Sequence, residues 1–441
     1  MPRLFGVEYV CFAAAMLMWF CPPAAAQTST NGDVTVAADL FPNRDNTTEM
    51  RSRLFVQELI DPAPRLRITL SGFAEGLLAH RPVHGAADGA RVNDGALGVL
   101  DASVSLKTTR VDLLAGFSRM SWGRLDELQP TDVINPLDAS RFFFESRSEA
   151  RLPVGLVRVR GYLSENATLE GVYVPFFRRG RFDQLDEPTS PFNVEPDFTD
   201  KRAVCLAIGC PTILPTRIHR KEPSATLNNG QGGVRLNATS GRVDWSISAY
   251  RGLEPAGLGT IGKLTPAAVF LPVDIVYPRF TMIGGDFETV HGEWGVRGEV
   301  AAFVNDNFQG SLRVVKGSSI DAGAGVDRRA GAYRISGTAL VHHEAYDEPI
   351  VGTDGATQGR SNLSLILAAD RTFARERYRL RTFAVYTPDD STAFLRAISI
   401  AKLRDNLALE GSIGWFAGEG RDVIGAFFDS DFLYARLKYY F

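Results

Sequence analysis

The sequence predicts an all-β fold: a transmembrane, antiparallel, up-and-down β-barrel of about 16 strands, with short periplasmic turns and long external loops. Three observations favour this fold. Short segments from Arg65 onward alternate apolar and polar residues, and the connections between them are alternately short and long. The chain also ends inside a strand, with Phe441 as its last residue.

The composition excludes several classes of protein. The 441 residues carry a formal net charge of -3, which argues against a nucleic-acid partner. A hydrophobic fraction of 45% argues against a disordered chain. A folded protein without a strong charge bias is expected.

The first 26 residues are typical of a cleaved signal peptide. Arg3 precedes an apolar run over 9–20, and Pro22-Pro23 and three alanines follow. The run is too short to cross a bilayer, so we expect residues 1–26 to be removed before Gln27. This predicts secretion through the inner membrane and localisation in the cell outer membrane.

The strand segments each have one apolar and one polar face. In 157–163 (VRVRGYL), Val157 and Val159 lie opposite Arg158 and Arg160, and 242–250 (RVDWSISAY) repeats the scheme. The last strand, DFLYARLKYYF, alternates in the same way. Its terminal Phe resembles the C-terminal signal recognised by the barrel-assembly machinery, which is therefore an expected partner.

The connections alternate in length. Tight turns are predicted at 108–110, 164–166, 240–241, 291–292 and 404–406. Long links are predicted at 81–95, 123–155, 176–230, 252–277, 304–317, 343–360 and 417–429. Turns at the periplasm and loops outside are typical of outer-membrane barrels. We expect the barrel to span 65–441, and 27–64 to form a periplasmic extension or a plug.

The second external loop, SWGRLDELQPTDVINPLDASR (121–141), has two interpretations. In the structural one, Asp132, Asn135 and Asp138 cap turns through bonds to backbone amides, and packing holds the loop against the wall. In the functional one, charged side chains form a constriction in the pore. The candidates for that constriction are Arg124, Asp126, Glu127, Asp132, Asp138 and Arg141.

Arginines are frequent on the face predicted to line the lumen. Charges belong there because one on the lipid face costs about 2–4 kcal/mol at the midplane. They either form ion-paired girdles or a basic ladder that favours anions. The pore candidates among them are Arg158, Arg160, Arg242, Arg297 and Arg334. The basic stretch 176–182 (FFRRGRF) would meet lipopolysaccharide, line the vestibule or lie in solvent.

The two cysteines after residue 26 are Cys205 and Cys210. In an oxidising compartment such a pair most simply forms a disulfide. A metal site would need two further ligands, and only His219 is near, so no metal and no cofactor are expected. No catalytic motif stands out, so an enzyme is not expected.

A family resemblance rests on residues 115–195. This segment resembles an outer-membrane family of poorly known function whose members carry a tryptophan-glycine pair, an Asp-x-x-Asn-Pro-x-Asp turn and a Tyr-x-Pro element. The matching positions are Trp122, Gly123, Asp132, Asn135, Pro136, Asp138, Tyr173 and Pro175. The resemblance implies a porin-like barrel, in a family whose members are often associated with export systems.

The sequence thus predicts an outer-membrane channel for passive diffusion of small solutes, which would favour anions if the wall arginines form a basic ladder and not ion-paired girdles. The alternative is a plugged barrel that acts in export or envelope assembly with an inner-membrane transporter. A third class is a surface adhesin or receptor. Outer-membrane lipid and lipopolysaccharide are expected partners in each case, and the choice between monomer and trimer stays open.

Overall fold

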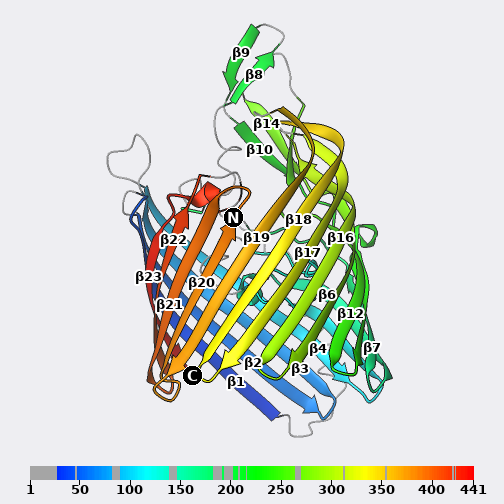
Figure 1. The fold of residues 1–441 in the computed structure, drawn as a ribbon, viewed down its shortest axis with the longest axis vertical. Helices are drawn as coiled ribbons and strands as arrows, with labels where there is room; N and C mark the ends of the chain where they lie inside the picture. The colour runs from blue at the N-terminus through cyan, green and yellow to red at the C-terminus, as the bar shows by residue number, and fades with distance from the viewer. Residues whose placement is uncertain are drawn as a thin grey trace.

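The computed structural model describes residues 27–44, 47–81, 90–138, 147–181, 191–192, 202–206, 209–214, 216–263, 270–310, 313–352, 355–419, 422 and 424–441. Eighteen strands form one closed antiparallel barrel (Figure 1). They are β1 (Gln27–Phe41), β2 (Thr47–Ala63), β3 (Leu66–Arg81), β4 (Ala90–Lys107), β5 (Val111–Ser118), β6 (Val154–Ser164), β7 (Ala167–Val174), β11 (Gln231–Ser240), β12 (Val243–Leu253), β15 (Arg279–His291), β16 (Trp294–Gln309), β17 (Val314–Ala330), β18 (Tyr333–Gly352), β19 (Gly355–Phe373), β20 (Tyr378–Thr387), β21 (Thr392–Arg404), β22 (Leu407–Ala417) and β23 (Phe432–Tyr440).

The barrel closes where its last strand meets its first. β23 pairs antiparallel with β1, in a register that sets Tyr440 opposite Asp33 and Leu433 opposite Leu40. β7 pairs with β11 and β12 with β15, so the chain excursions between those strands do not interrupt the wall. Every other wall strand pairs with its neighbours in chain order.

The predicted fold class is confirmed, with 18 strands where the sequence predicts about 16. The prediction for the N-terminal part is wrong, because residues 27–63 are wall strands, neither an extension nor a plug. In β1, Val34 and Val36 are exposed on the outer face while Asp33 and Asp39 alternate with them. Many of its residues are small or polar, which hides this alternation in the sequence. Residues 1–26, the predicted signal peptide, lie outside the described residues.

The wall is apolar outside and polar inside. Ile247, Ile283 and Leu367 are 55%, 57% and 63% exposed on the outer face. Their neighbours Ser246, Ser248 and Asp286 are buried within the barrel. An apolar surface that continues around the barrel is costly in water and favourable in hydrocarbon, so this is the fold of an outer-membrane barrel.

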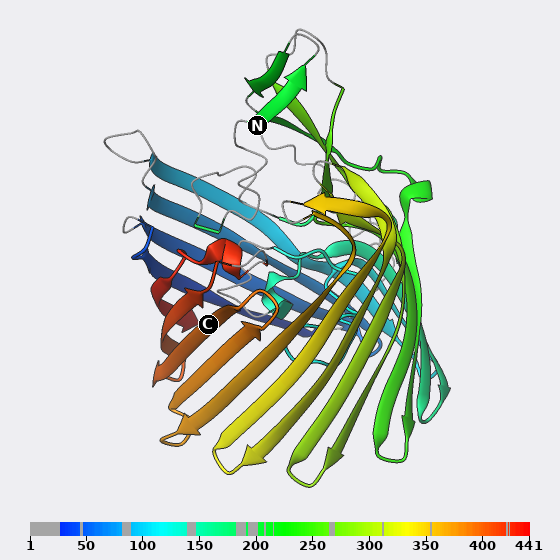
Figure 2. The ribbon, with the colours of Figure 1, turned by 45° about the horizontal axis from the view of Figure 1, so that its top comes forward.

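The two ends of the barrel differ, as the sequence predicts. At one end, which we call the turn end, tight hairpins join the strands. These hairpins form the lower edge of the barrel in Figure 2. Gly241, Gly292 and Gly331 have φ of 62°, 62° and 61° in these hairpins, a conformation that glycine adopts without strain. The opposite end, here the loop end, carries the long connections.

The loop end has secondary structure of its own. β8 (Arg202–Leu206) pairs with β9 (Gly209–Leu214), and β14 (Leu271–Val276) lies between β10 (Thr216–Lys221) and β13 (Leu258–Ile261). Short helical segments are α2 (Arg147–Ala150), η2 (Leu227–Asn229) and η3 (Gly425–Phe427). Cys205 and Cys210 lie on β8 and β9, but their side chains are outside the described residues, so the disulfide stays a prediction. Within the described residues, no helix is long and apolar enough to cross a bilayer.

A charge on the outer face should destabilise the barrel. Ala339 lies exposed on β18, between Ala324 of β17 and Leu365 of β19. Ala339→Arg should lower the free energy of unfolding in lipid vesicles by about 2–4 kcal/mol, because the cation would lie in hydrocarbon. The change in free energy is measured by titration with denaturant, in which the gel mobility of unheated protein reports the folded fraction. Ala339→Leu is the control and should be nearly neutral, whereas equal stability of the two variants would contradict a lipid-facing β18.

Candidate functional site

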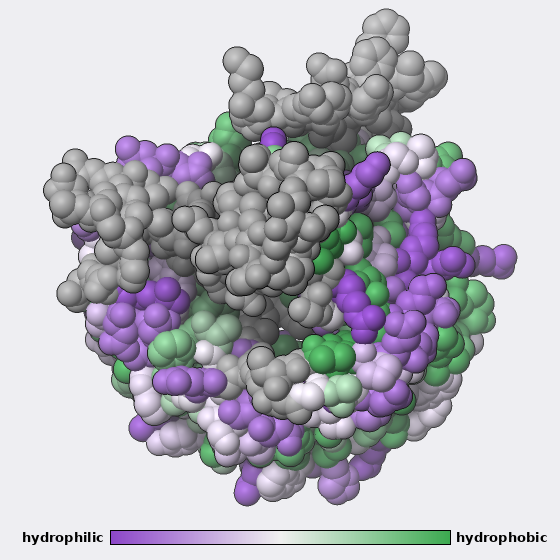
Figure 3. Space-filling model, turned by 90° about the horizontal axis from the view of Figure 1, so that it is seen from above, coloured by the Kyte–Doolittle hydropathy of each residue, from purple (hydrophilic) through white to green (hydrophobic). Residues whose placement is uncertain are grey.

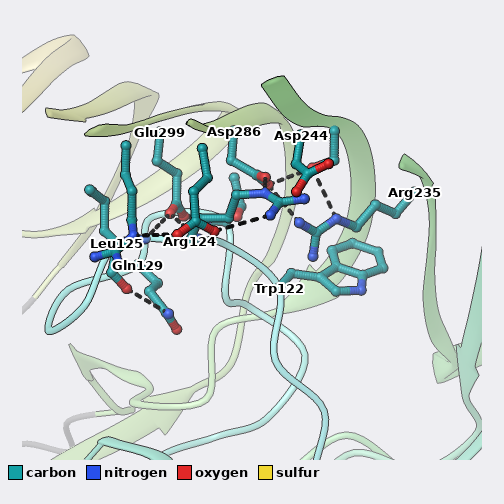
Figure 4. A network of polar contacts seen from close by, with 12 residues as sticks. Trp122, Arg124, Leu125, Gln129, Arg235, Asp244, Asp286 and Glu299 are labelled. Carbon is teal, nitrogen blue, oxygen red and sulfur yellow. Dashed lines mark hydrogen bonds and ion pairs between the residues drawn. The ribbon is translucent and has the colours of Figure 1, made fainter. Parts of the chain in front are cut away.

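The connection between β5 and β6 folds into the lumen of the barrel. Trp122 is 1% exposed, and its indole Nε1 donates a hydrogen bond of 2.9 Å to the carboxylate of Glu170 on β7. Its ring meets the ring of Tyr250 on β12 edge-on, with centroids 6.1 Å apart. Figure 4 shows the indole beside Arg235, below the wall carboxylates. Trp122 therefore anchors the loop to one side of the wall.

Glu299 of β16 is the central acceptor for the loop. Its carboxylate accepts hydrogen bonds from the backbone N–H groups of Arg124 (2.9 Å), Leu125 (3.2 Å) and Thr131 (2.7 Å). The Thr131 hydroxyl donates a fourth hydrogen bond, of 2.8 Å, to the same carboxylate. Gly123 has φ of 90°, and a Cβ there would lie 2.5 Å from Glu299 Oε1. Glycine is thus required where the backbone approaches this carboxylate.

Ion pairs continue the attachment along the wall. Three successive charged side chains of the loop pair with groups on strands from β15 to β20. They are Arg124 with Asp286 (2.7 Å), Asp126 with Arg297 (2.8 Å) and Arg334 (3.3 Å), and Glu127 with Arg381.

An apolar contact lies among these pairs. Leu125 is 1% exposed and packs over two glycines of β17. A Cβ on Gly323 would lie 2.6 Å from Leu125 Cδ1, and one on Gly325 would lie 3.3 Å from Leu125 Cδ2. The wall therefore has a shallow recess that receives this leucine.

The second half of the loop is held by its own polar side chains. Asp132 forms a salt bridge of 2.6 Å with Arg151. The Asn135 amide accepts a bond from the Met120 N–H at 2.8 Å and donates one to the Leu152 carbonyl at 2.8 Å. The N–H of Leu152 donates to the carbonyl of Pro136 at 2.8 Å. The Asp-x-x-Asn-Pro sequence thus ties the two ends of the loop together.

The structure brings most of the predicted loop residues into the lumen. The charged side chains found there are Arg124, Asp126, Glu127, Asp132 and Asp138. Each is paired with a group of the wall or of a neighbouring segment, so they hold the loop in place. Asp138 lies 3.8 Å from Arg181, which belongs to the neighbouring segment after β7. Arg141 lies outside the described residues.

The predicted wall arginines have different surroundings. Arg160 is paired with Glu170 at 2.6 Å, and Arg297 and Arg334 share Asp126 with the loop. Arg158 faces the lumen and forms no salt bridge with any described residue. Arg242 is exposed in the turn between β11 and β12, so its prediction as a pore residue is wrong. The tight turn begins one residue later in the chain than its sequence suggests.

Several residues of the site are not identified by the sequence reasoning. Asp286 and Arg151 hold the loop, but neither falls in a recognisable motif. Arg51 and Arg53 face the lumen from β2, a segment predicted to lie outside the wall. The signal that could have found them is the alternation in 51–55 (RSRLF), where both arginines fall on one face.

A cavity of about 420 Å³ remains between the loop and the wall formed by β2, β3 and β4. Its apolar lining includes Phe73 and Leu152. Its lining also contains the carboxylates of Glu75, Asp94, Asp138 and Glu149. The six arginines in the lining are Arg51, Arg53, Arg151, Arg178, Arg179 and Arg181. Burial lowers the pKa of the Arg178 guanidinium, which still stays charged at neutral pH. The cavity is therefore polar, and arginines outnumber carboxylates in its lining. Three of these arginines have carboxylate partners outside the lining: Arg51 pairs with Glu49, Arg151 with Asp132 and Arg179 with Glu222.

An aromatic cluster lies at the loop end of the barrel, on β1, β21, β22 and β23. Phe192 packs against Phe41 of β1, Phe416 of β22 and Phe427 of η3, with ring centroids 5.4 to 6.2 Å apart. The Ser430 hydroxyl donates a bond of 2.6 Å to the Pro191 carbonyl and holds the segment there. In the view from the loop end, hydrophilic residues gather around the barrel mouth, and hydrophobic residues are visible on the outer wall (Figure 3).

Replacing Glu299 with Ala should release the loop without opening the barrel. Three buried N–H groups would lose their acceptor, and each unpaired group costs about 1–3 kcal/mol. We expect protease to cleave within 123–138 while the unheated protein keeps its gel mobility. Glu410→Ala is the matched control, because Glu410 bonds Tyr434 and, in the described structure, no loop residue. If protease spares the loop equally in both variants, Glu299 is not its anchor.

Comparison with solved structures finds other barrels of low sequence identity. OccK7 (OpdD) of Pseudomonas aeruginosa is 10% identical, with a TM-score of 0.49, over 95% of this chain and 99% of that chain. OpdK of the same organism is 11% identical, with a TM-score of 0.48, over 94% and 99%. An anion-selective porin from Comamonas acidovorans is 11% identical, with a TM-score of 0.40, over 94% and 100%.

Comparison with curated protein sequences finds no match. A family model described as a protein of unknown function, DUF1302, matches residues 100–365, which is more than half of the chain. The segment 115–195, on which the sequence resemblance rests, lies within the matched residues. The chain therefore belongs to the DUF1302 family, and the loop folded into its lumen lies within the part that defines the family.

Proposed function

We propose that the protein is a porin-like outer-membrane channel through which small solutes, anions in preference to cations, diffuse down their gradients. The observation that carries the proposal is the arginine-lined cavity between the lumenal loop and β2–β4. A water-accessible passage with an excess of fixed positive charge raises the local concentration of anions. This cavity would be the narrowest part of the route.

The attachment of the loop supports a fixed constriction. Trp122, Glu299 and the ion pairs from β15 to β20 hold the loop against one half of the wall. Moving the loop away from the wall would break many charge-assisted hydrogen bonds at once, at a large cost in free energy. The free cross-section of the lumen would therefore be set by the structure and would act as a sieve.

A second candidate function rests on the aromatic cluster around Phe192. The cluster lies on β1 and β21–β23, beside the cavity, and β10, β13 and β14 extend beyond the loop end of the barrel (Figure 1). A barrel closed from both sides would not conduct, and it would suit an export or envelope-assembly component that works with an inner-membrane transporter. Such a component would open only when its partner binds.

Single-channel recording in a planar bilayer with a salt gradient tests the proposal. Wild-type protein should show stable open steps, and its reversal potential should have the sign expected of an anion-selective channel. Arg53→Gln and Arg179→Gln, singly and together, should move that potential toward cations. Each should change the permeability ratio by up to about fivefold, since a unit charge at ~4 Å in water contributes about 1 kcal/mol.

Arg242→Gln is the control for this experiment, because Arg242 lies in a turn away from the cavity. It should leave the reversal potential unchanged. An unaltered potential in the cavity variants would assign those arginines a structural role. Silence from correctly folded wild-type protein would instead support the closed barrel.

A further inference from the structure

The turn end of the β17–β22 sector is strongly basic. The turns of this sector carry the carboxylates of Glu376 and Asp405, which the exposed cations there outnumber. The seven exposed cations are Arg328, Arg329, Arg371, Arg375, Arg377, Lys402 and Arg404. We call this set the basic rim. Other turns of the barrel carry fewer cations, such as Arg65 between β2 and β3 and Arg242 between β11 and β12.

The basic rim differs from the lumen in how its charges are neutralised. Arg124, Arg160 and Arg297 in the lumen all have carboxylate partners. Within the rim, Arg328 is paired with Glu293 at 3.2 Å. In the described part of the chain, the other rim cations form no salt bridge. Like charges that outnumber the nearby counter-charges repel one another, so an anionic partner would stabilise them.

The rim arginines lie at the level of the aromatic girdle. The Arg328 guanidinium is 5.1 Å from the centre of the Trp294 ring, and Arg377 is 5.8 Å from that of Tyr378. Arg371 is 4.7 Å from the Tyr333 ring and shares the lipid-facing side of β19 with Leu367. Aromatic girdles mark the membrane interface, where the lipid phosphates lie.

The three turns form one continuous surface. The Thr372 N–H bonds the Ala332 carbonyl at 3.2 Å, which joins the β17–β18 turn to β19. The Lys402 N–H bonds the Arg377 carbonyl at 2.9 Å, which joins the β19–β20 turn to β21. These hairpins, yellow to orange, lie side by side along the lower edge of Figure 2. The cations are thus presented together.

We propose that the basic rim binds the phosphate groups of anionic phospholipids in the periplasmic leaflet of the outer membrane. Guanidinium groups bind phosphate oxygens through paired hydrogen bonds, and basic residues near a membrane surface attract anionic lipids. The lipid-facing side chain of Arg371 and the stacking on girdle aromatics favour a lipid over a soluble acidic protein. The proposal is independent of whether the barrel conducts.

Native mass spectrometry of the purified barrel with phosphatidylglycerol or phosphatidylethanolamine tests the proposal. Wild-type protein should bind the anionic lipid more tightly. The triple variant R329Q/R371Q/R377Q should lose about a hundredfold of that preference, since each arginine contributes about fivefold. The matched control R65Q/R110Q/R242Q removes three exposed turn arginines from the opposite sector and should keep the preference.

If the triple variant folds poorly, Arg371→Gln alone serves as the test. It should lower the preference for the anionic lipid about fivefold. Equal binding of the two lipids by wild-type protein would overturn the proposal and leave the rim to a soluble acidic partner. Equal losses in the rim and control variants would also overturn it, because binding would then follow total charge and not this surface.

Discussion

Closure of the β-sheet is the constraint on which the rest of the structure depends. In hydrocarbon no water is available to bond free N–H and C=O groups, so a sheet that spans the membrane cannot have an edge. The pairing of β23 with β1 removes that edge. Closure then divides the side chains into those that face lipid and those that face the lumen, and charged groups are confined to the lumen.

Charges gathered inside a closed wall need partners, and the loop between β5 and β6 supplies them. Glu299 accepts four hydrogen bonds from the loop, and Asp286 and Arg381 pair with its charged side chains. An unpaired buried carboxylate would be costly, so loop and wall stabilise each other. The same contacts leave a basic cavity on the opposite side of the lumen, along β2–β4.

The molecule therefore uses arginine in three settings. Arginines paired with carboxylates hold the loop, arginines outnumber carboxylates in the lining of the cavity, and the arginines of the basic rim extend toward the membrane interface. The distinction lies in the carboxylates nearby and not in the residue type. Net charge, which is -3 for the whole chain, conceals this separation.

The sequence by itself determined the fold class, the alternation of turns and loops, and the position of the motif-bearing loop at 121–141. These follow from local patterns: a period of two along each strand, and the Gly, Asn and Pro that bend the loop. Only the tertiary structure decided that residues 27–63 belong to the wall, that Arg242 lies in a turn, and that Glu299 meets Gly123. The approach of Glu299 to Gly123 depends on register around a closed barrel, which joins residues more than 150 positions apart and leaves no local pattern in the chain. The wall strands in 27–63 and the position of the turn at Arg242 are only weakly marked in the local sequence.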